Sequence, residues 1–290
     1  MRSALRRIEL ALPLKTGLMC RAIRERMGGV MSPFPTSVAH RPYPLPLGPW
    51  RLTQRWNDLL FAHWPVAVGE IQALLPEGLE VDTFDGWAWV GVVPFWMDKV
   101  KTRIAGDVVL GTPGASSFSE LNLRTYVRSK ATGLAGVFFF SLDCASPLAV
   151  IGARILFSLP YFFAAMRRVS TADGVEYASR RLLTRTPARF EAAYRAAGPV
   201  MPVSQPGSLE HFLTERYALF TLRGGRFAVG HIQHLPWPLQ AADAEIRVNG
   251  IAVAHGIRLP DRAPVLHYAR SLEVFLWGLG TDRDDWRKEV

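Results

Sequence analysis

Residues 118–128, with the sequence FSELNLRTYVR, alternate polar and apolar side chains along most of their length. A period of two is typical of a β-strand, because successive side chains point to opposite faces. One face of this strand is expected to carry an acid, an amide, a guanidinium and a phenol, from Glu120, Asn122, Arg124 and Tyr126. Such a row can hold a small polar ligand. The sequence therefore predicts a pocket beside this strand, without indicating what enters it.

Strand patterns recur along the rest of the chain, and turn residues separate them. Asp85-Gly86, Asp173-Gly174 and Gly224-Gly225 are pairs that favour hairpin turns. The pattern predicts roughly ten strands, assigned to one domain over residues 41–280. Strands joined by short turns pair antiparallel, and a sheet of this size closes into a barrel or splits into stacked sheets, which removes exposed edges. The expected fold class is α+β and dominated by β-strands.

Three short helices are expected between the strands. One begins at Pro65, because proline is favoured at the first helical position. A second spans residues 147–156, and a third spans residues 209–214 with Ser208 as its N-cap. Residues 99–117 are rich in glycine, serine and proline and predict a long loop.

The net charge of +9 comes almost entirely from arginine, which is concentrated near the N-terminus. The basic residues form no stripe with interleaved aromatic residues, so nucleic-acid binding is not expected. Residues 1–40 are interpreted as a disordered or mis-annotated extension, and residues 281–290 as a charged tail. A membrane-surface helix over residues 1–31 is the alternative, and its amphipathic pattern is weak.

The most apolar stretch, residues 134–166, does not predict a membrane span. Charged residues and prolines interrupt it before about 20 uncharged residues accumulate. They are Asp143, Pro147, Arg154 and Pro160. Stable membrane insertion is therefore not expected.

The two cysteines, Cys20 and Cys144, are far apart and outside any CxxC pair. The sequence therefore predicts neither a zinc site nor a disulfide, and reduced thiols indicate a cytoplasmic protein. The chain has no glycine-rich phosphate loop and no dinucleotide-binding fingerprint, so no cofactor is expected.

Five segments of the chain resemble the YqjF-like family of uncharacterised bacterial proteins, over about residues 50–278. They are residues 74–86 (LLPEGLEVDTFDG), 120–127 (ELNLRTYV), 139–143 (FFSLD), 159–161 (LPY) and 234–239 (HLPWPL). The second segment is the most specific. The resemblance implies a fold related to acetoacetate decarboxylase, a closed or cone-like antiparallel β-barrel with helices packed outside. It implies no established activity.

The related decarboxylase forms a Schiff base on a lysine whose pKa is lowered by an apolar site and a second cation. That mechanism needs a lysine on an inward-facing strand position. Lys99 and Lys101 lie in the predicted loop, Lys130 in a turn, and Lys15 and Lys288 in the terminal segments. The resemblance therefore supports the barrel but not the lysine mechanism, unless Lys99 or Lys101 enters the barrel mouth.

Arg124 is the first candidate for a catalytic role, as a clamp for a carboxylate or phosphate. A guanidinium between leucines is costly to bury unless it is paired or meets a ligand anion. The alternative is a structural ion pair with Glu120 or with Asp143. Glu120 is the candidate acid or base, with a pKa raised by apolar neighbours. Its alternative is a carboxylate that Arg124 holds in the ionised state.

The remaining candidates are substrate-binding residues. Asn122 and Tyr126 would orient a ligand by hydrogen bonds or, alternatively, be satisfied core polar groups. His63 either binds a ligand or packs beside Trp64. The other candidates are Asp143, Trp89 and His234. His234 has no acidic residue at a matching spacing, so no metal site is expected.

These residues predict a barrel that binds a small anionic or carbonyl-containing molecule. It would be an enzyme that acts on a carboxylate or carbonyl substrate without a Schiff-base lysine. The alternative is a non-catalytic binding or interaction protein with an apolar cavity. The sequence leaves homo-oligomerisation open.

Overall fold

The computed structural model describes Phe34 and residues 37–106, 108–111 and 114–281. The predicted extension and tail lie largely outside the described residues. The part described contains a 13-stranded sheet, three α-helices and one short 3₁₀ helix. The elements are β1 (Leu52–Val66), α2 (Val68–Gln72), β2 (Leu79–Val81), β3 (Ala88–Ala105), β4 (Val108–Gly111), β5 (Phe118–Ser129), β6 (Ala135–Cys144), α3 (Pro147–Phe157), β7 (Tyr161–Thr171), β8 (Gly174–Arg181), β9 (Arg189–Val200), α4 (Leu209–Thr214), β10 (Ala218–Arg223), β11 (Arg226–Gln233), β12 (Leu239–Asn249), η1 (Val253–His255) and β13 (Val265–Leu276).

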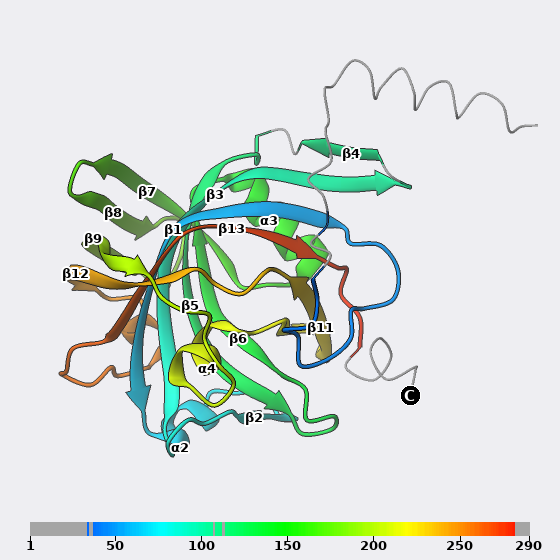
Figure 1. Ribbon diagram of the computed structural model, residues 1–290, viewed down its shortest axis with the longest axis horizontal. Helices are drawn as coiled ribbons and strands as arrows, with labels where there is room; N and C mark the ends of the chain where they lie inside the picture. Colours follow the sequence, from blue (N-terminus) through cyan, green and yellow to red (C-terminus); the bar gives the residue numbers. More distant parts are fainter. Residues whose placement is uncertain (1–33, 35–36, 107, 112–113, 282–290) are drawn as a thin grey trace, which may run out of the picture.

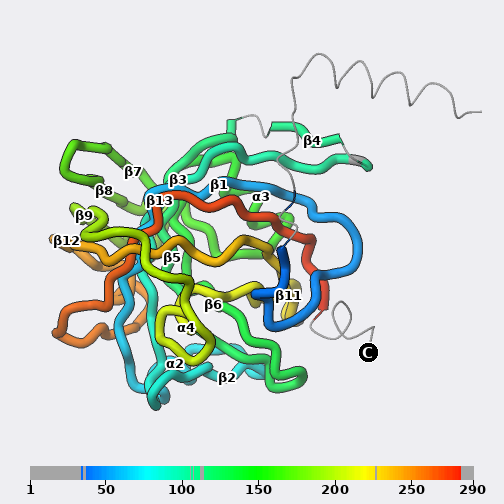
Figure 2. The backbone as a smooth tube through the Cα atoms, viewed as in Figure 1, coloured from blue at the N-terminus to red at the C-terminus, as the bar shows by residue number. Residues whose placement is uncertain are grey.

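Nine of the strands in the described part of the chain form a closed barrel (Figure 1). The pairing runs β6-β7-β8-β9-β12-β13-β1-β3-β5, and β5 pairs back with β6. The first and last strands of the chain, β1 and β13, lie side by side (Figure 2) and pair antiparallel over most of their length. Closure removes free edges from these strands. The prediction of a β-dominated barrel is therefore confirmed.

A second ring of strands shares a wall with the nine-stranded barrel. Strand β10 pairs with β6 and with β11, and β11 pairs with β13. The second ring thus runs β5-β6-β10-β11-β13-β1-β3. A strand in the shared wall faces an interior on both sides. This explains why residues 120–127 of β5 are all buried, whichever face they occupy.

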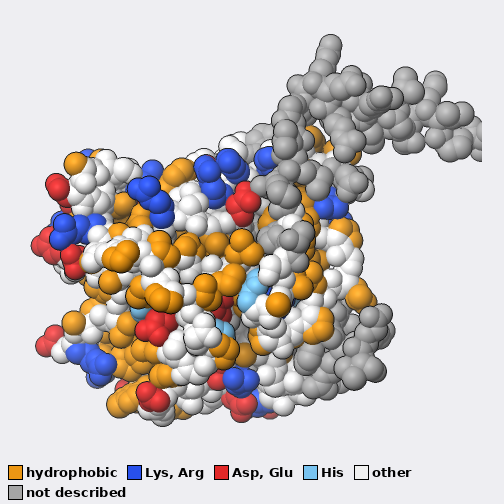
Figure 3. Space-filling view, in the orientation of Figure 1, with side chains coloured by type: hydrophobic (Ala, Val, Ile, Leu, Met, Phe, Trp, Pro, Cys, Tyr) orange, Lys and Arg blue, Asp and Glu red, His pale blue; other side chains and the backbone are white. Residues whose placement is uncertain are grey.

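The apolar face of β5 belongs to the core of the nine-stranded barrel. Leu121 and Leu123 pack there with the rings of Tyr177, Phe190 and Tyr194 from β8 and β9. On the outside of this barrel, β12 alternates between exposed and half-buried residues. Charged side chains of both signs lie at the left of Figure 3. Between β9 and β12, the ion pair of Arg195 and Asp243 joins exposed groups. The nine-stranded barrel is therefore the filled, structural half of the fold.

Three predictions about local structure are wrong. Pro65 lies inside β1, and the helix begins only at Val68, because Pro65 still pairs with Trp89 of β3. The predicted loop over residues 99–117 is largely β-structure, since β3 continues to Ala105 and β4 pairs with it. The sheet is also not purely antiparallel, because β6 pairs parallel with β7 and β10. Helix α3 provides the crossover between β6 and β7 that a parallel pair needs.

The helices predicted over residues 147–156 and 209–214 are present as α3 and α4. The side chain of Ser208 caps α4 by accepting a hydrogen bond from the His211 N–H, as predicted. Residues 134–166 form β6, α3 and the first half of β7, joined by short connecting segments. In the residues that the structure covers, the helices are all too short or too polar to cross a bilayer.

Gly91 of β3 allows the shared wall to accommodate a buried histidine. A Cβ atom at Gly91 would lie 2.9 Å from both Cδ2 and Nε2 of His63, and 3.5 Å from Cγ of Arg124. The His63 ring cannot easily move away, because it is fully buried and its Nε2 lies 2.7 Å from the Tyr126 hydroxyl. Glycine is therefore required at this position by packing.

We expect Gly91→Ala to lower the free energy of unfolding by about 1–3 kcal/mol, because the added methyl overpacks the wall. Urea denaturation measures the change. Gly198→Ala is the matched control, since this exposed strand glycine has no atom within 4 Å of the added Cβ. Equal effects of the two substitutions would contradict the packing argument.

Candidate functional site

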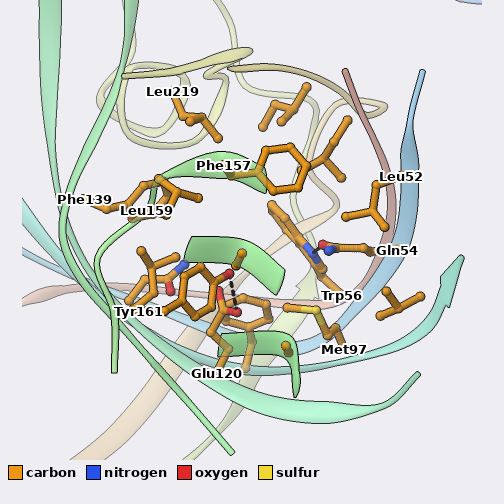
Figure 4. Close-up of a pocket in the computed structure, with 18 of the residues that line it drawn as sticks. Leu52, Gln54, Trp56, Met97, Glu120, Phe139, Phe157, Leu159, Tyr161 and Leu219 are labelled. Carbon is orange, nitrogen blue, oxygen red and sulfur yellow. Dashed lines mark hydrogen bonds between the residues drawn. The ribbon is translucent and has the colours of Figure 1, made fainter. Parts of the chain in front are cut away.

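The second ring lines a partly open cavity of about 180 Å³ beneath α3 (Figure 4). Its walls come from β1, β3, β5, β6 and α3, with contributions from β7, β10, β11 and β13. Most of the lining side chains are apolar, including Trp56, Met97, Phe139, Phe157, Leu159 and Leu219. A dry apolar cavity of about 150 Å³ holds benzene, so this one has room for a small organic molecule.

Three residues of the predicted polar row line the cavity, namely Glu120, Asn122 and Arg124. Their common face on β5 follows from the strand alternation. Three more polar residues, Thr214, Arg216 and His234, line it near the segment that follows α4. Gln54, Thr102 and Tyr161 complete the polar part of the lining. The cavity therefore has one strongly polar wall within an otherwise apolar enclosure.

Glu120 is a buried carboxyl group that is neutral near pH 7. Burial raises its pKa to about 8, against the opposing effect of hydrogen bonds from Tyr161 and Asn122. The Tyr161 hydroxyl donates to Glu120 Oε2 over 2.8 Å (Figure 4). Within the described residues the groups that act on Glu120 are Tyr161, Asn122 and Asp143, and no ion pair joins it to Arg124. The alternative of a carboxylate held ionised by Arg124 is therefore wrong.

Arg124 is a buried cation without a carboxylate partner in the described part of the chain. Its Nη2 donates to the Leu213 carbonyl oxygen over 3.1 Å and to the Tyr126 hydroxyl over 3.2 Å. Its Nε has no hydrogen-bond partner there, and the side chain is largely buried. The predicted alternative of an ion pair with Glu120 or Asp143 is not found. A buried charge of this kind is stabilised by an anion that enters its site.

His63 and Tyr126 lie behind the cavity wall and support Arg124. The Tyr126 hydroxyl donates to the Leu213 carbonyl oxygen over 2.7 Å, so its contact with His63 assigns the ring proton to His63 Nε2. Burial, and then the charges of Arg124 and His267, lower the pKa of His63 well below its usual range. Neither His63 nor Tyr126 is part of the cavity lining. They orient Arg124 and hold the end of α4.

Two other candidates also lie away from the cavity lining. Asp143 accepts a hydrogen bond from Arg181 Nε over 2.7 Å in a buried ion pair. The same guanidinium also contacts Ser141 and His255. Trp89 is buried, and its Nε1 donates to the Phe84 carbonyl oxygen over 3.4 Å. The structure therefore brings together Glu120, Asn122, Arg124 and His234 but not the other four candidates.

His234 contributes a neutral ring to the cavity. Burial lowers its pKa, and the ring stacks on Tyr217 at 4.6 Å between centroids. Its Nδ1 lies 2.8 Å from the Leu235 carbonyl oxygen. Across the described residues, His, Cys, Asp and Glu side chains form no group of three that could hold a metal ion.

The lysines that the structure describes do not line the cavity. Lys99 occupies a bulge in β3 with a φ of 51° and is exposed. Beyond the bulge, Val100 and Thr102 line the cavity, so Lys101 between them faces the other way. Lys130 is exposed, and Lys15 and Lys288 lie outside the described residues.

Sequence reasoning missed Tyr161, Thr214 and Arg216 as lining residues. Tyr161 begins β7 and reaches Glu120 from 41 positions away in the chain. Arg216 is held by Asp82, with Nη1 2.6 Å from Oδ2, across 134 positions. No local pattern marks such contacts. The Leu159-Pro-Tyr161 segment was one of the family segments, but nothing in it indicated a partner for Glu120.

We expect Glu120→Gln to change the pH dependence of stability. The unfolded chain ionises Glu120 above about pH 4.5 and the folded chain only near pH 8, so rising pH between these values favours the unfolded state. Glutamine does not ionise, so the variant does not lose stability in this way as the pH rises. The variant should gain stability relative to the wild type by on the order of 1 kcal/mol per pH unit across this window. Urea denaturation at several pH values measures the difference.

The matched control is Glu245→Gln, which removes an exposed carboxylate from β12. A stability difference for Glu120→Gln that stays constant from pH 5 to pH 8 would contradict a neutral Glu120. A difference of the opposite sign would show that the folded state prefers the carboxylate.

Comparisons with known proteins identify relatives of this chain and of its fold. Residues 53–273 match the model of the DUF2071 family, described as an uncharacterized conserved protein. The uncharacterized protein YqjF of Bacillus subtilis (strain 168) is 45% identical over 240 residues, covering 81% of this chain and 94% of YqjF.

Solved structures show the same fold at low sequence identity. Acetoacetate decarboxylase from Legionella pneumophila superposes with a TM-score of 0.53 at 13% identity, covering 87% of this chain and 99% of that one. The enduracididine biosynthesis enzyme MppR complexed with pyruvate superposes with a TM-score of 0.52 at 14% identity, covering 85% and 93% of the two chains. The predicted likeness to the acetoacetate decarboxylase barrel is therefore confirmed.

Proposed function

The chain belongs to the DUF2071 family, and we propose that its second ring binds a small carboxylate or carbonyl compound and acts on it by acid–base chemistry without a Schiff-base lysine. One observation carries this proposal. Arg124 faces the cavity as a buried guanidinium without a carboxylate partner in the described residues. A ligand anion supplies the missing charge.

Glu120 is the proposed acid and base. A carboxyl group with a pKa of about 8 carries a proton near neutral pH and can give it up within a moderate range. It would give its proton to the carbonyl oxygen while a water molecule takes a proton from the adjacent carbon, and the reverse transfers would restore the ketone and the acid, with Tyr161 holding its Oε2. Asn122 and His234 would orient the ligand between Glu120 and Arg124. The pyruvate bound to MppR, a protein of the same fold, supports this class of ligand.

The apolar lining favours a second candidate, a non-catalytic binding protein. Most of the cavity wall offers only packing contacts, and in this reading Glu120 is a structural partner of Tyr161. The two functions differ in what Glu120→Gln does. It stops turnover in the enzyme and leaves ligand binding unchanged in the binding protein.

We also propose that residues 41–280 work as one domain in the cytoplasm. Cys144 is a free, buried thiol, which suits a reducing compartment.

The test measures how fast the C3 protons of 2-oxo acids are exchanged for deuterium. Purified protein is incubated with pyruvate or 2-oxohexanoate in D₂O, and NMR follows the loss of the C3 proton signals. The wild type should accelerate exchange, and Glu120→Gln should slow it at least 100-fold, in the range that general acid–base catalysis contributes. Borohydride added during incubation should leave the protein mass unchanged, because no lysine adduct forms.

Arg124→Leu should abolish binding of both acids while the protein stays folded by circular dichroism. Arg128→Leu is the matched control, since Arg128 lies on the same strand, pairs with Asp82 and is exposed. Binding of both 2-oxo acids without exchange would favour the non-catalytic reading. Borohydride-trapped adducts would contradict the mechanism without lysine.

A further inference from the structure

We propose that the ligand is an amphiphilic monocarboxylate, with its carboxylate at Arg124 and an apolar body lying under α3. This inference rests on the proposed function and specifies its substrate class. The cavity has two ends of different character. Arg124 and Glu120 line it from the same face of β5, four residues apart, and α3 lines it from a separate element.

The carboxylate end is at the junction of β5 with the segment that follows α4. Arg124 Nη2 is fixed to the Leu213 carbonyl oxygen, which leaves Nη1 for a ligand. Thr214 and Arg216 line the cavity beside it. The buried Arg216 already has a carboxylate partner, because its Nη1 lies 2.6 Å from the buried Asp82, whose other partner, Arg128, is exposed to solvent. One unmatched cation at this end therefore calls for one anionic group.

The opposite end lies against α3, whose sequence PLAVIGARILF contains a single charged residue. That residue, Arg154, donates from Nε to the Tyr161 carbonyl oxygen over 2.8 Å and is not in the cavity lining. The residues that α3 gives to the cavity are apolar: Leu148, Ala149, Gly152, Ala153, Leu156 and Phe157. This end can pack a hydrocarbon, but it has no partner for a second charge.

Glu120 stands between these two ends and does not add a second charge near pH 7. Its protonated form can face an anionic ligand without repulsion, and its hydrogen bond to Tyr161 keeps it at the wall. A ligand with charges at both ends would instead place an anion among apolar residues, which is costly.

The small residues of α3 set the size of the apolar body. A Cβ atom added at Gly152 would meet no atom within 4 Å, so helix packing does not explain this glycine. Glycine inside a helix costs about 1 kcal/mol relative to alanine. Because a cavity of about 150 Å³ holds one benzene molecule, this cavity of about 180 Å³ has room for roughly seven or eight non-hydrogen atoms. Hexanoate has this size, and acetate leaves the α3 end empty.

Isothermal titration of the full chain with acetate, hexanoate, hexanedioate and hexan-1-ol tests the proposal. Hexanoate should bind at least tenfold more tightly than acetate, since each buried methylene adds about fourfold. Hexanedioate should bind at least tenfold more weakly than hexanoate. If acetate or hexanedioate binds as tightly as hexanoate, the substrate class is wrong while the carboxylate site stands.

Ala153→Leu tests the apolar end without touching the polar wall. It should weaken hexanoate binding at least tenfold and leave acetate binding within twofold. Ile155→Leu is the matched control, because Ile155 lies on the same helix and is 66% exposed. Equal loss of both acids would overturn the assignment of the hydrocarbon to α3.

Arg124→Leu separates this inference from the function on which it rests. It should abolish hexanoate binding and leave hexan-1-ol binding within threefold. If hexanoate binds the wild type and Arg124→Leu alike, the anion site itself fails, and the proposed function fails with it. If Arg124→Leu does not fold, the affinities of the wild type for hexanoate and hexan-1-ol are compared instead. The wild type should bind hexanoate at least fivefold more tightly than hexan-1-ol. Equal affinities would contradict the anion site.

Discussion

The fold depends on β5 serving as a wall between two closed rings of strands. One face of β5 packs Leu121 and Leu123 into the filled nine-stranded barrel, and the other presents Glu120, Asn122 and Arg124 to the cavity. A strand in this position has no solvent face, so its polar residues must find partners or ligands inside the protein. In most strands, alternation places one set of side chains in the core and the other in solvent. In β5 it places one set in a packed core and the other in the cavity.

The buried charged side chains near this wall fall into two sets, those with an oppositely charged partner and those without one. Asp82 accepts hydrogen bonds from the buried Arg216 and the exposed Arg128, and Asp143 accepts one from Arg181, so the buried Arg216 and Arg181 each have a carboxylate partner. In the described residues Arg124 has neutral oxygen atoms and the rings of Phe61 and Tyr126 as partners, but no carboxylate. The contrast distinguishes ion pairs that hold the structure together from a cation placed for a ligand, and it places the chemistry at Arg124 and Glu120.

The anchoring of α4 connects the wall to the cavity. Arg124 and Tyr126 both donate to the carbonyl oxygen of Leu213, and Arg216 then reaches back to Asp82. The segment after α4 is thereby fixed over one end of the cavity, while α3 covers the other. A ligand in between would contact groups from strands and loops that are far apart in the chain.

The alternating pattern of residues 118–128 was sufficient to predict β5 and a polar row with a common face, because a strand has a period of two regardless of its surroundings. The family segments predicted the barrel. The sequence could not show that Tyr126 points behind the wall or that Asp143 pairs with Arg181, since partners from other strands decide these contacts. The extent of β3 was missed because β4 supplies its hydrogen bonds, and the parallel pairs depend on where α3 carries the chain. Local periodicity thus determined the elements and the candidate row, and only long-range packing decided which of those side chains meet in a cavity and which charge is left without a partner.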